Sequence, residues 1–312
     1  MQDAPYLPAD LHRQIQVDCI YTVHYFEYTK HYRYAGEAHD FWECVYVDRG
    51  EVIATAGTEN ITLGRGEILF HPPNEWHTLR ANGVVAPNLV VLSFASRSPL
   101  MESFRGRHMR PGNRGRALIS AILRESESVF ATPLGDPRTK HMQKKHPAVV
   151  PPGAEQLILT YLEELLILLL REENTRPVSV LRHRESGDLF TLLCNFMQEN
   201  IGRRLSLADL SHRAGVSEST IKALFRSRTG GGALAYFIRR KTDAAKILIR
   251  EGNYNLSQIS DLLGYESIHY FSRQFRAVTG MSPSEYARSV RAMEEDSGTE
   301  DSDPENTVDS PV

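Results

Sequence analysis

The sequence predicts an α+β protein of two domains, the first rich in β-strands and the second entirely helical. Three observations support this fold class. The chain has 312 residues, which is enough for two domains of roughly 150 residues each. Short apolar runs separated by turn residues fill residues 15–95. The last third of the chain repeats one helical pattern, first in residues 205–230 and again in residues 256–280.

Residues 15–112 are predicted to form a β-barrel or sandwich that follows an N-terminal arm, residues 1–14. Short apolar runs occur at residues 44–47, 52–54, 68–70 and 89–92. Stretches rich in Gly, Asp, Asn and Pro separate these runs. Several short strands with close turns are typical of barrels and sandwiches.

Residues 113–173 are predicted to be a helical region. A helix from about residue 113 to 130 precedes a stronger one at 154–173, whose apolar positions form one broad face. Between them, residues 131–153 contain several prolines and a basic cluster, so we expect a mobile loop. The broad face favours dimerisation, although the helix could instead cover only its own barrel.

The repeated segment has the layout of a helix-turn-helix. Each copy contains a short amphipathic helix, a turn with Gly215 or Gly264, and a second helix ending in Phe-Arg-x-x-Thr-Gly. Ser217 is the predicted N-cap of the second helix in the first copy, and Ser267 or Glu266 begins the second helix in the other copy. In that copy Ile259, Leu262 and Leu263 are expected to pack inward. A second helix of this kind can enter the major groove of DNA, and two matched copies in one chain make chance unlikely as an explanation.

The distribution of charge agrees with DNA binding. Residues 184–291 contain 16 Lys and Arg against 10 Asp and Glu, a balance of +6, whereas the remainder carries 20 against 29, a balance of −9. The positive charge therefore lies on the segment that would meet phosphates. Residues 174–186 are predicted to be a linker, and residues 292–312 an acidic, disordered tail.

The second copy resembles the AraC/XylS family of transcriptional regulators. Residues 264–286 carry the pattern Gly-Tyr-x-Ser-x-x-Tyr-Phe-Ser-Arg-x-Phe-Arg-x-x-Thr-Gly-x-Ser-Pro-x-x-Tyr, and the resemblance covers the domain at 187–291. It implies seven helices that form two helix-turn-helix subdomains, joined by a long connector at about residues 233–250. It also implies that the two second helices enter successive major grooves, about 34 Å apart.

The resemblance also points to particular DNA contacts. Arg273 is the sharpest candidate, because arginine can bind guanine through two hydrogen bonds. Ala223 departs from the family pattern, since many relatives carry a long polar residue there, so we expect the first helix to read fewer bases. The predicted DNA-binding residues are Ser219, Lys222, Ala223, Arg226, Ile268, His269, Arg273 and Arg276.

The N-terminal half resembles a cupin barrel, the usual sensor domain of such regulators. Metal-binding cupins use a His-x-His pair, a Glu and a later His; here His39, Glu43 and His77 match, and Glu37 replaces the first His. The resemblance implies an effector pocket without a metal or other cofactor. The predicted pocket residues are Glu37, His39, Glu43, His77, Trp42 and Tyr46.

These patterns favour a DNA-binding transcription regulator, not an enzyme, that acts as a homodimer. Its expected partners are double-stranded promoter DNA, RNA polymerase and a small-molecule effector, for which the resemblance suggests a carbohydrate. Two alternatives stay open. The barrel could be a metal enzyme with ligands His39, Glu43 and His77, or it could be only a dimerisation scaffold.

Three scattered cysteines indicate reduced thiols, and no stretch resembles a signal peptide or a membrane span, so we expect a cytoplasmic protein.

Overall fold

The structure is a computed structural model that describes residues 7, 9–56, 59–174 and 189–298. It divides into two compact units. The first comprises Met1–Glu27, Tyr34–Asn82 and Pro87–Arg176, and the second comprises Tyr28–Arg33, Gly83–Ala86 and Pro177–Val312. The predicted linker after residue 174, and residues 1–6 and 8 of the predicted arm, lie outside the described residues.

The N-terminal domain is built on two antiparallel sheets, which confirms the predicted β-rich first half. The larger sheet has the strand order β1 (Cys19–Glu27), β8 (Asn88–Ala95), β3 (Trp42–Arg49), β6 (Ile68–His71) and β9 (His108–Met109). The smaller sheet has the order β2 (Arg33–Glu37), β7 (His77–Ala81), β4 (Glu51–Ala56) and β5 (Glu59–Gly64).

Strand β3 separates two environments because side chains alternate along a strand. Trp42, Cys44 and Tyr46 belong to the apolar core that also contains helix residues. Glu43 lies on the opposite face, where it pairs in register with His71 of β6 and with Ser93 of β8. This alternation decides which predicted site residues can meet.

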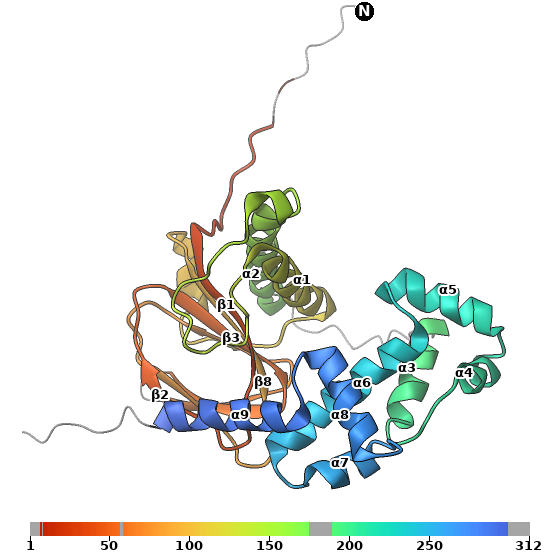
Figure 1. The fold of residues 1–312 in the computed structure, drawn as a ribbon. Coiled ribbons are helices and arrows are strands. Elements are labelled where there is room, and N and C mark those ends of the chain that lie inside the picture. The colour runs from red at the N-terminus through yellow and green to blue at the C-terminus, as the bar shows by residue number, and fades with distance from the viewer. Residues whose placement is uncertain (1–6, 8, 57–58, 175–188, 299–312) are drawn as a thin grey trace, which may run out of the picture. The chain divides into compact units, whose positions relative to one another are not determined.

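Two helices, α1 (Asn113–Val129) and α2 (Ala154–Asn174), pack side by side next to the strands (Figure 1). Leu118 and Ile122 of α1 and Leu162 and Leu165 of α2 are buried in the same core as Trp42. The short 3₁₀ helices η1 (Pro99–Phe104) and η2 (Pro147–Val149) complete the domain.

The predicted loop 131–153 has anchors that the sequence did not reveal. Leu134 and Met142 are buried in the apolar core. The backbone N–H of Tyr25 donates to the carbonyl of Leu134 at 2.9 Å, and Phe130 forms a β-bridge with Lys144. The prediction of mobility did not anticipate these contacts.

The second unit is helical, as predicted, and its described helices form two cores. The first core lies among α3 (Leu189–Glu199), α4 (Leu207–Ala214), α5 (Glu218–Thr229) and the start of α6 (Ala233–Glu251). The second lies among the end of α6, α7 (Leu256–Leu262), α8 (Ile268–Thr279) and α9 (Pro283–Gly298). Helix α6 therefore contributes to both cores and is the predicted connector.

Two predictions in this unit are wrong in detail. Leu262, which we expected to pack inward, is 48% exposed because α7 ends there and the chain turns away at Leu263. Helix α9 continues to Gly298, so the first residues of the predicted acidic tail are helical. Residues 299–312 of that tail lie outside the described residues.

Among the described residues, no helix is both long enough and apolar enough to cross a membrane.

Candidate DNA interface and candidate ligand sites

The first helix-turn-helix consists of α4, a left-handed turn and α5. Ser206 and Asp209 form a capping box at the start of α4, and the helix ends at Gly215, with φ +65°. Ser217 caps α5 by accepting a hydrogen bond from the backbone N–H of Thr220, as predicted. Ile221 and Phe225 are buried, which fixes the inward face of α5.

The second helix-turn-helix repeats this plan with α7 and α8. Asn255 and Gln258 form a capping box on α7, and Gly264 turns the chain with φ +62°. Ser267 caps α8 through the backbone N–H of Tyr270, so the predicted alternative of Glu266 is excluded. Phe271 and Phe275 are fully buried in the second core.

The outer faces of α5 and α8, which we call the recognition helices, carry the predicted DNA-binding residues. All eight are exposed to solvent, as a DNA contact requires: Ser219, Lys222, Ala223, Arg226, Ile268, His269, Arg273 and Arg276. Lys222 lies 3.9 Å from Glu218, and the guanidinium of Arg273 lies 5.2 Å from the ring centre of Tyr270. Both cations thus rest against their own helix in the absence of DNA.

In the N-terminal domain four predicted pocket residues converge. Glu37 ends β2 and His77 begins β7, both in the smaller sheet; Glu43 lies on β3 of the larger sheet, and His39 lies in the loop between. One ligand atom from each lies within 4.8 Å of the others. We call these four residues the polar cluster.

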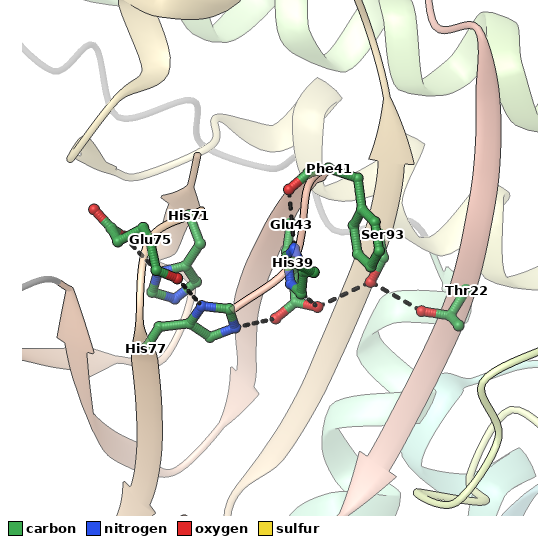
Figure 2. A network of polar contacts seen from close by, with 8 residues as sticks. All are labelled: Thr22, His39, Phe41, Glu43, His71, Glu75, His77 and Ser93. Carbon is green, nitrogen blue, oxygen red and sulfur yellow. Dashed lines mark hydrogen bonds and ion pairs between the residues drawn. The ribbon is translucent and has the colours of Figure 1, made fainter. Parts of the chain in front are cut away.

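Hydrogen bonds fix the orientation of the polar cluster (Figure 2). Nδ1 of His39 lies 3.0 Å from the carbonyl oxygen of Phe41, and Nδ1 of His77 lies 3.0 Å from that of Glu75. One carboxylate oxygen of Glu43 accepts a hydrogen bond of 2.9 Å from the hydroxyl of Ser93. The Nε2 atoms of both imidazoles are buried without a hydrogen-bond partner and face Glu43.

The charge of Glu43 dominates the electrostatics of the cluster. Burial opposes the charged carboxylate, but the imidazoles of His39 and His77 outweigh it and hold the pKa of Glu43 below its usual range. Burial favours neutral imidazole at His77, yet the adjacent Glu43 raises the pKa of His77. Burial lowers the pKa of His71, despite its hydrogen bond to Glu75. Glu43 therefore stays a carboxylate that attracts cations.

The structure does not bring Trp42 and Tyr46 into this cluster. Their side chains lie on the other face of β3, packed in the core with α1 and α2. Sequence reasoning grouped them with Glu43 because they are neighbours in the chain, but a strand sends adjacent side chains to opposite faces. It also missed Ser93 and Glu75, which hold the cluster from β8 and from the turn before β7.

A cavity of about 630 Å³ lies in the same domain, on the helix side of β3. Tyr46 lines it together with Tyr25 and residues of α1. Four arginines contribute to the lining against two acidic residues: Arg65, Arg110, Arg116 and Arg124 against Asp48 and Glu127. Its volume suits a small molecule, and its charge favours an anionic one.

Two family models match the two halves of the chain. An AraC-like ligand binding domain matches residues 20–128, and a helix-turn-helix domain matches residues 210–289. The chain belongs to the AraC family of transcriptional regulators. This AraC-family regulator thus combines a ligand-binding domain with a DNA-binding domain, as the sequence predicted.

Similar proteins are also transcriptional regulators by name. An uncharacterized HTH-type transcriptional regulator of Bacillus subtilis (strain 168), YfiF, is 23% identical over 288 residues, covering 88% of this chain and 85% of YfiF. The probable transcriptional regulator LumQ of Photobacterium leiognathi is 37% identical over 100 residues, 32% of this chain. The chain spans 40% of LumQ in that match.

Solved structures that are similar include the DNA-binding domain of AdpA in complex with a target DNA, at 25% identity, 35% of this chain, 97% of that chain and a TM-score of 0.33. They also include ToxT from Vibrio cholerae strain SCE256 with a bound unsaturated fatty acid, at 12% identity, 89% of this chain, 97% of that chain and a TM-score of 0.33.

Proposed function

We propose that this AraC-family regulator is a homodimer that binds promoter DNA through both recognition helices and responds to a small-molecule effector held in its N-terminal domain. One observation carries the DNA-binding part. Both recognition helices bury their phenylalanines and expose their cationic faces, within a domain of positive charge balance. That division is what insertion into a major groove requires.

Helix α6 sets the spacing of the two recognition helices. Its 19 residues span about 28 Å at 1.5 Å per residue. Successive major grooves on one face of DNA are about 34 Å apart, so the connector is of the right order to place α5 and α8 in neighbouring grooves. Base reading is assigned to Ser219, Lys222, Ala223, Ile268, His269 and Arg273, and backbone contacts to Arg226 and Arg276.

Helix α2 is the proposed dimer surface. Its inner face is buried in the domain core, and Leu157, Tyr161 and Leu168 form a half-buried stripe at helical spacing beside it, where Tyr161 and Leu168 also pack partly against that core. A two-fold axis beside this stripe would pair it with its own copy. Leu168→Glu should therefore favour monomers in analytical ultracentrifugation. Thr160→Glu adds the same charge at an exposed position of α2 and should leave the dimer intact.

The cavity beside α1 is the proposed effector site. Its four arginines favour an anionic metabolite, such as a carboxylate or a sugar phosphate, over the neutral carbohydrate suggested by resemblance. Sugar phosphates and small carboxylates should raise the melting temperature more than neutral sugars do. Arg124→Ala should abolish that shift, whereas Arg97→Ala, an exposed arginine outside the cavity lining, should keep it.

The test of the whole proposal is footprinting of the full-length protein on its own upstream region, with and without the compounds that raise the melting temperature. We expect two protected half-sites per protomer whose occupancy changes with the effector. No protection at any DNA would refute the DNA-binding role. Protection that no compound alters would instead support the alternative of a constitutive regulator with a scaffold barrel.

The remaining parts of the proposal are contact with RNA polymerase at the regulated promoter and action in the cytoplasm. Transcription in a purified system with polymerase, this protein and the footprinted promoter tests the first part, because a regulator that contacts polymerase alters transcript yield from that promoter. A promoter with scrambled half-sites is the matched control.

A further inference from the structure

Arg273, the sharpest of the predicted base contacts, lies over an aromatic ring instead of beside a carboxylate. The Cζ atom of its guanidinium is 5.2 Å from the ring centre of Tyr270, which is half-buried and lies three residues earlier on α8. Helical side chains lean toward the N-terminus of their helix, so residues at i and i+3 meet on one face. Arg273 forms no hydrogen bond or ion pair with the residues that the structure describes. Tyr270 is therefore the side chain that supports this guanidinium.

A ring is a suitable support for an arginine that reads a base. It attracts the cation through its π-face and does not accept from the N–H donors as a carboxylate does. Guanine is bound by two parallel hydrogen bonds, which need two free N–H groups on one guanidinium. Ordering a long side chain also costs rotamer entropy, and a side chain that is already restrained loses less of it on binding. The Tyr270 ring thus restrains Arg273 while the donors of the guanidinium stay available.

Contacts within the second helix-turn-helix fix Tyr270 itself. Its backbone N–H donates to the hydroxyl of Ser267, the N-cap of α8, at 3.2 Å. Its ring centre lies 6.2 Å from that of Tyr265, within the range of aromatic pairs. Tyr265 packs against the second core, where its ring centre is 5.2 Å from that of Phe271. The ammonium of Lys241 on α6 lies 5.0 Å from the same ring centre. The support of the guanidinium is therefore anchored in the core and in the connector helix.

The first helix-turn-helix offers an internal comparison. Aligning the capping serines of the two recognition helices places Thr220 of α5 at the position of Tyr270. The same alignment places Ala223 at the position of Arg273. Helix α5 thus lacks the ring and the arginine together, as expected if the ring serves the arginine.

We propose that Tyr270 is a positioning residue for base recognition: its ring holds the Arg273 guanidinium in the orientation that reads a base in the major groove. Tyr270 is not among the residues predicted to contact DNA, and this role requires no contact between its ring and a base. The inference rests on the proposed base reading by Arg273. It concerns discrimination between sequences and not overall affinity, because sequence-independent binding comes from phosphate contacts.

The experiment measures affinities of the full-length protein, at fixed salt, for the footprinted operator and for duplexes with one base pair changed. Tyr270→Leu removes the ring but keeps an apolar side chain. It should lower discrimination at the base pair that Arg273 reads by on the order of 5-fold, and leave discrimination at the other positions unchanged. Tyr270→Phe keeps the ring and removes only the hydroxyl, so it should discriminate as the wild type does. The matched control is Tyr254→Leu, which removes an exposed tyrosine before α7 and should leave discrimination unchanged.

A double variant tests whether the ring acts through the arginine. Tyr270→Leu combined with Arg273→Ala should discriminate as Arg273→Ala alone does, because the ring then has no guanidinium to support. Circular dichroism establishes that each variant is folded, and equal binding to a duplex without the operator shows that phosphate contacts are intact. Tyr270→Met is a second ring-free variant if Tyr270→Leu does not fold.

Three results would overturn the role of Tyr270 and leave base reading by Arg273 intact. The first is full discrimination by the folded ring-free variants while Arg273→Ala loses it. The second is an equal loss of discrimination in Tyr270→Phe and Tyr270→Leu, which would assign the effect to the hydroxyl. The third is a uniform loss of affinity for all duplexes, which would make Tyr270 a phosphate contact or a support of the fold. Full discrimination by Arg273→Ala would instead refute the base contact itself, and the role of Tyr270 with it.

Discussion

The two helix-turn-helix units follow one plan but depend on different contacts. In both, a capping box opens the first helix, a left-handed glycine lies in the turn, and a serine caps the recognition helix. In the first unit, a Cβ placed on Gly215 would meet no atom within 4 Å. In the second, a Cβ on Gly264 would lie 2.2 Å from the carbonyl oxygen of Gly202.

Further contacts enclose the second turn. The Lys241 ammonium, on α6, donates a 2.6 Å hydrogen bond to the carbonyl of Leu263, and Arg204 pairs with Glu266. In the first turn, the hydroxyl of Ser211 donates to the carbonyl of Val216 at 2.5 Å, a contact within the same motif. The same motif can thus be held locally in one copy and by distant parts of the domain in the other.

Replacing the turn glycines should give the largest difference in stability between the two units. Gly264→Ala combines a left-handed backbone with a clash against backbone that cannot move aside, so we expect a loss of more than about 4 kcal/mol of unfolding free energy. Gly215→Ala faces only the conformational cost, about 1–2 kcal/mol. Urea unfolding of the full-length protein, followed by circular dichroism, measures both. Equal losses would mean that Gly202 yields readily and that the enclosure of the second turn has no energetic weight.

Base reading should also differ between the units. Arg273 presents a planar fork with two donors, whereas Lys222 in the first unit is a point charge that already lies near Glu218. Arg273→Ala should cost about 1–3 kcal/mol in DNA binding and relax base preference at one position, and Lys222→Ala should weaken DNA binding less and relax base preference at its own position only slightly. Affinities for a set of single-base operator variants, measured at fixed salt, test both predictions. A uniform loss for Arg273→Ala would make it a phosphate contact.

The helix-turn-helix units were predictable because their signals are local. Glycines, capping serines and phenylalanines at i and i+4 act within a few residues, and the structure confirms them. The contacts of Lys241 with Leu263 and of Gly264 with Gly202 join residues that no periodicity connects, so the sequence could not reveal them.

The polar cluster shows the same limit. Three of its members follow a known spacing, and the structure brings them together with Glu37. The partner Ser93 comes from a strand fifty residues away, and only the pairing of β3 with β8 places it beside Glu43. The misplacement of Trp42 and Tyr46 has a simpler cause, because the alternation of β3 was already readable in the sequence.

The charged brace of the second turn should make its stability depend on pH. Desolvation lowers the pKa of Lys241 from 10.5 to about 8. Between these values the unfolded chain holds the proton more tightly than the folded one, so stability should rise as pH increases through this window. Below pH 8 both states are protonated, and the cost of the buried charge is constant. We expect a gain on the order of 2 kcal/mol from pH 8 to pH 10.5.

The unfolding free energies of the wild type and of Lys241→Met should therefore differ by an amount that changes with pH, because the other lysines and tyrosines titrate alike in both proteins. Ser211→Ala supplies the comparison from the first unit: it removes a neutral brace, so its cost should be the same at pH 8 and pH 10. Unfolding free energies from urea titrations at several pH values test both. A pH-independent difference for Lys241→Met would show that folding does not lower the pKa of Lys241.

Removing the helix caps should cause the smallest loss of stability, and the losses in the two units should agree most closely. Ser217 and Ser267 each accept a hydrogen bond from the backbone N–H three residues later, at 3.3 and 3.2 Å. Replacement by alanine leaves one helix N–H to water in either unit, so Ser217→Ala and Ser267→Ala should each cost about 1 kcal/mol. The Ser217 hydroxyl also contacts Ser219 and Thr220, but those contacts are exposed and add little. If Ser267→Ala proved far more costly than Ser217→Ala, the enclosure of the second turn would extend into α8 itself.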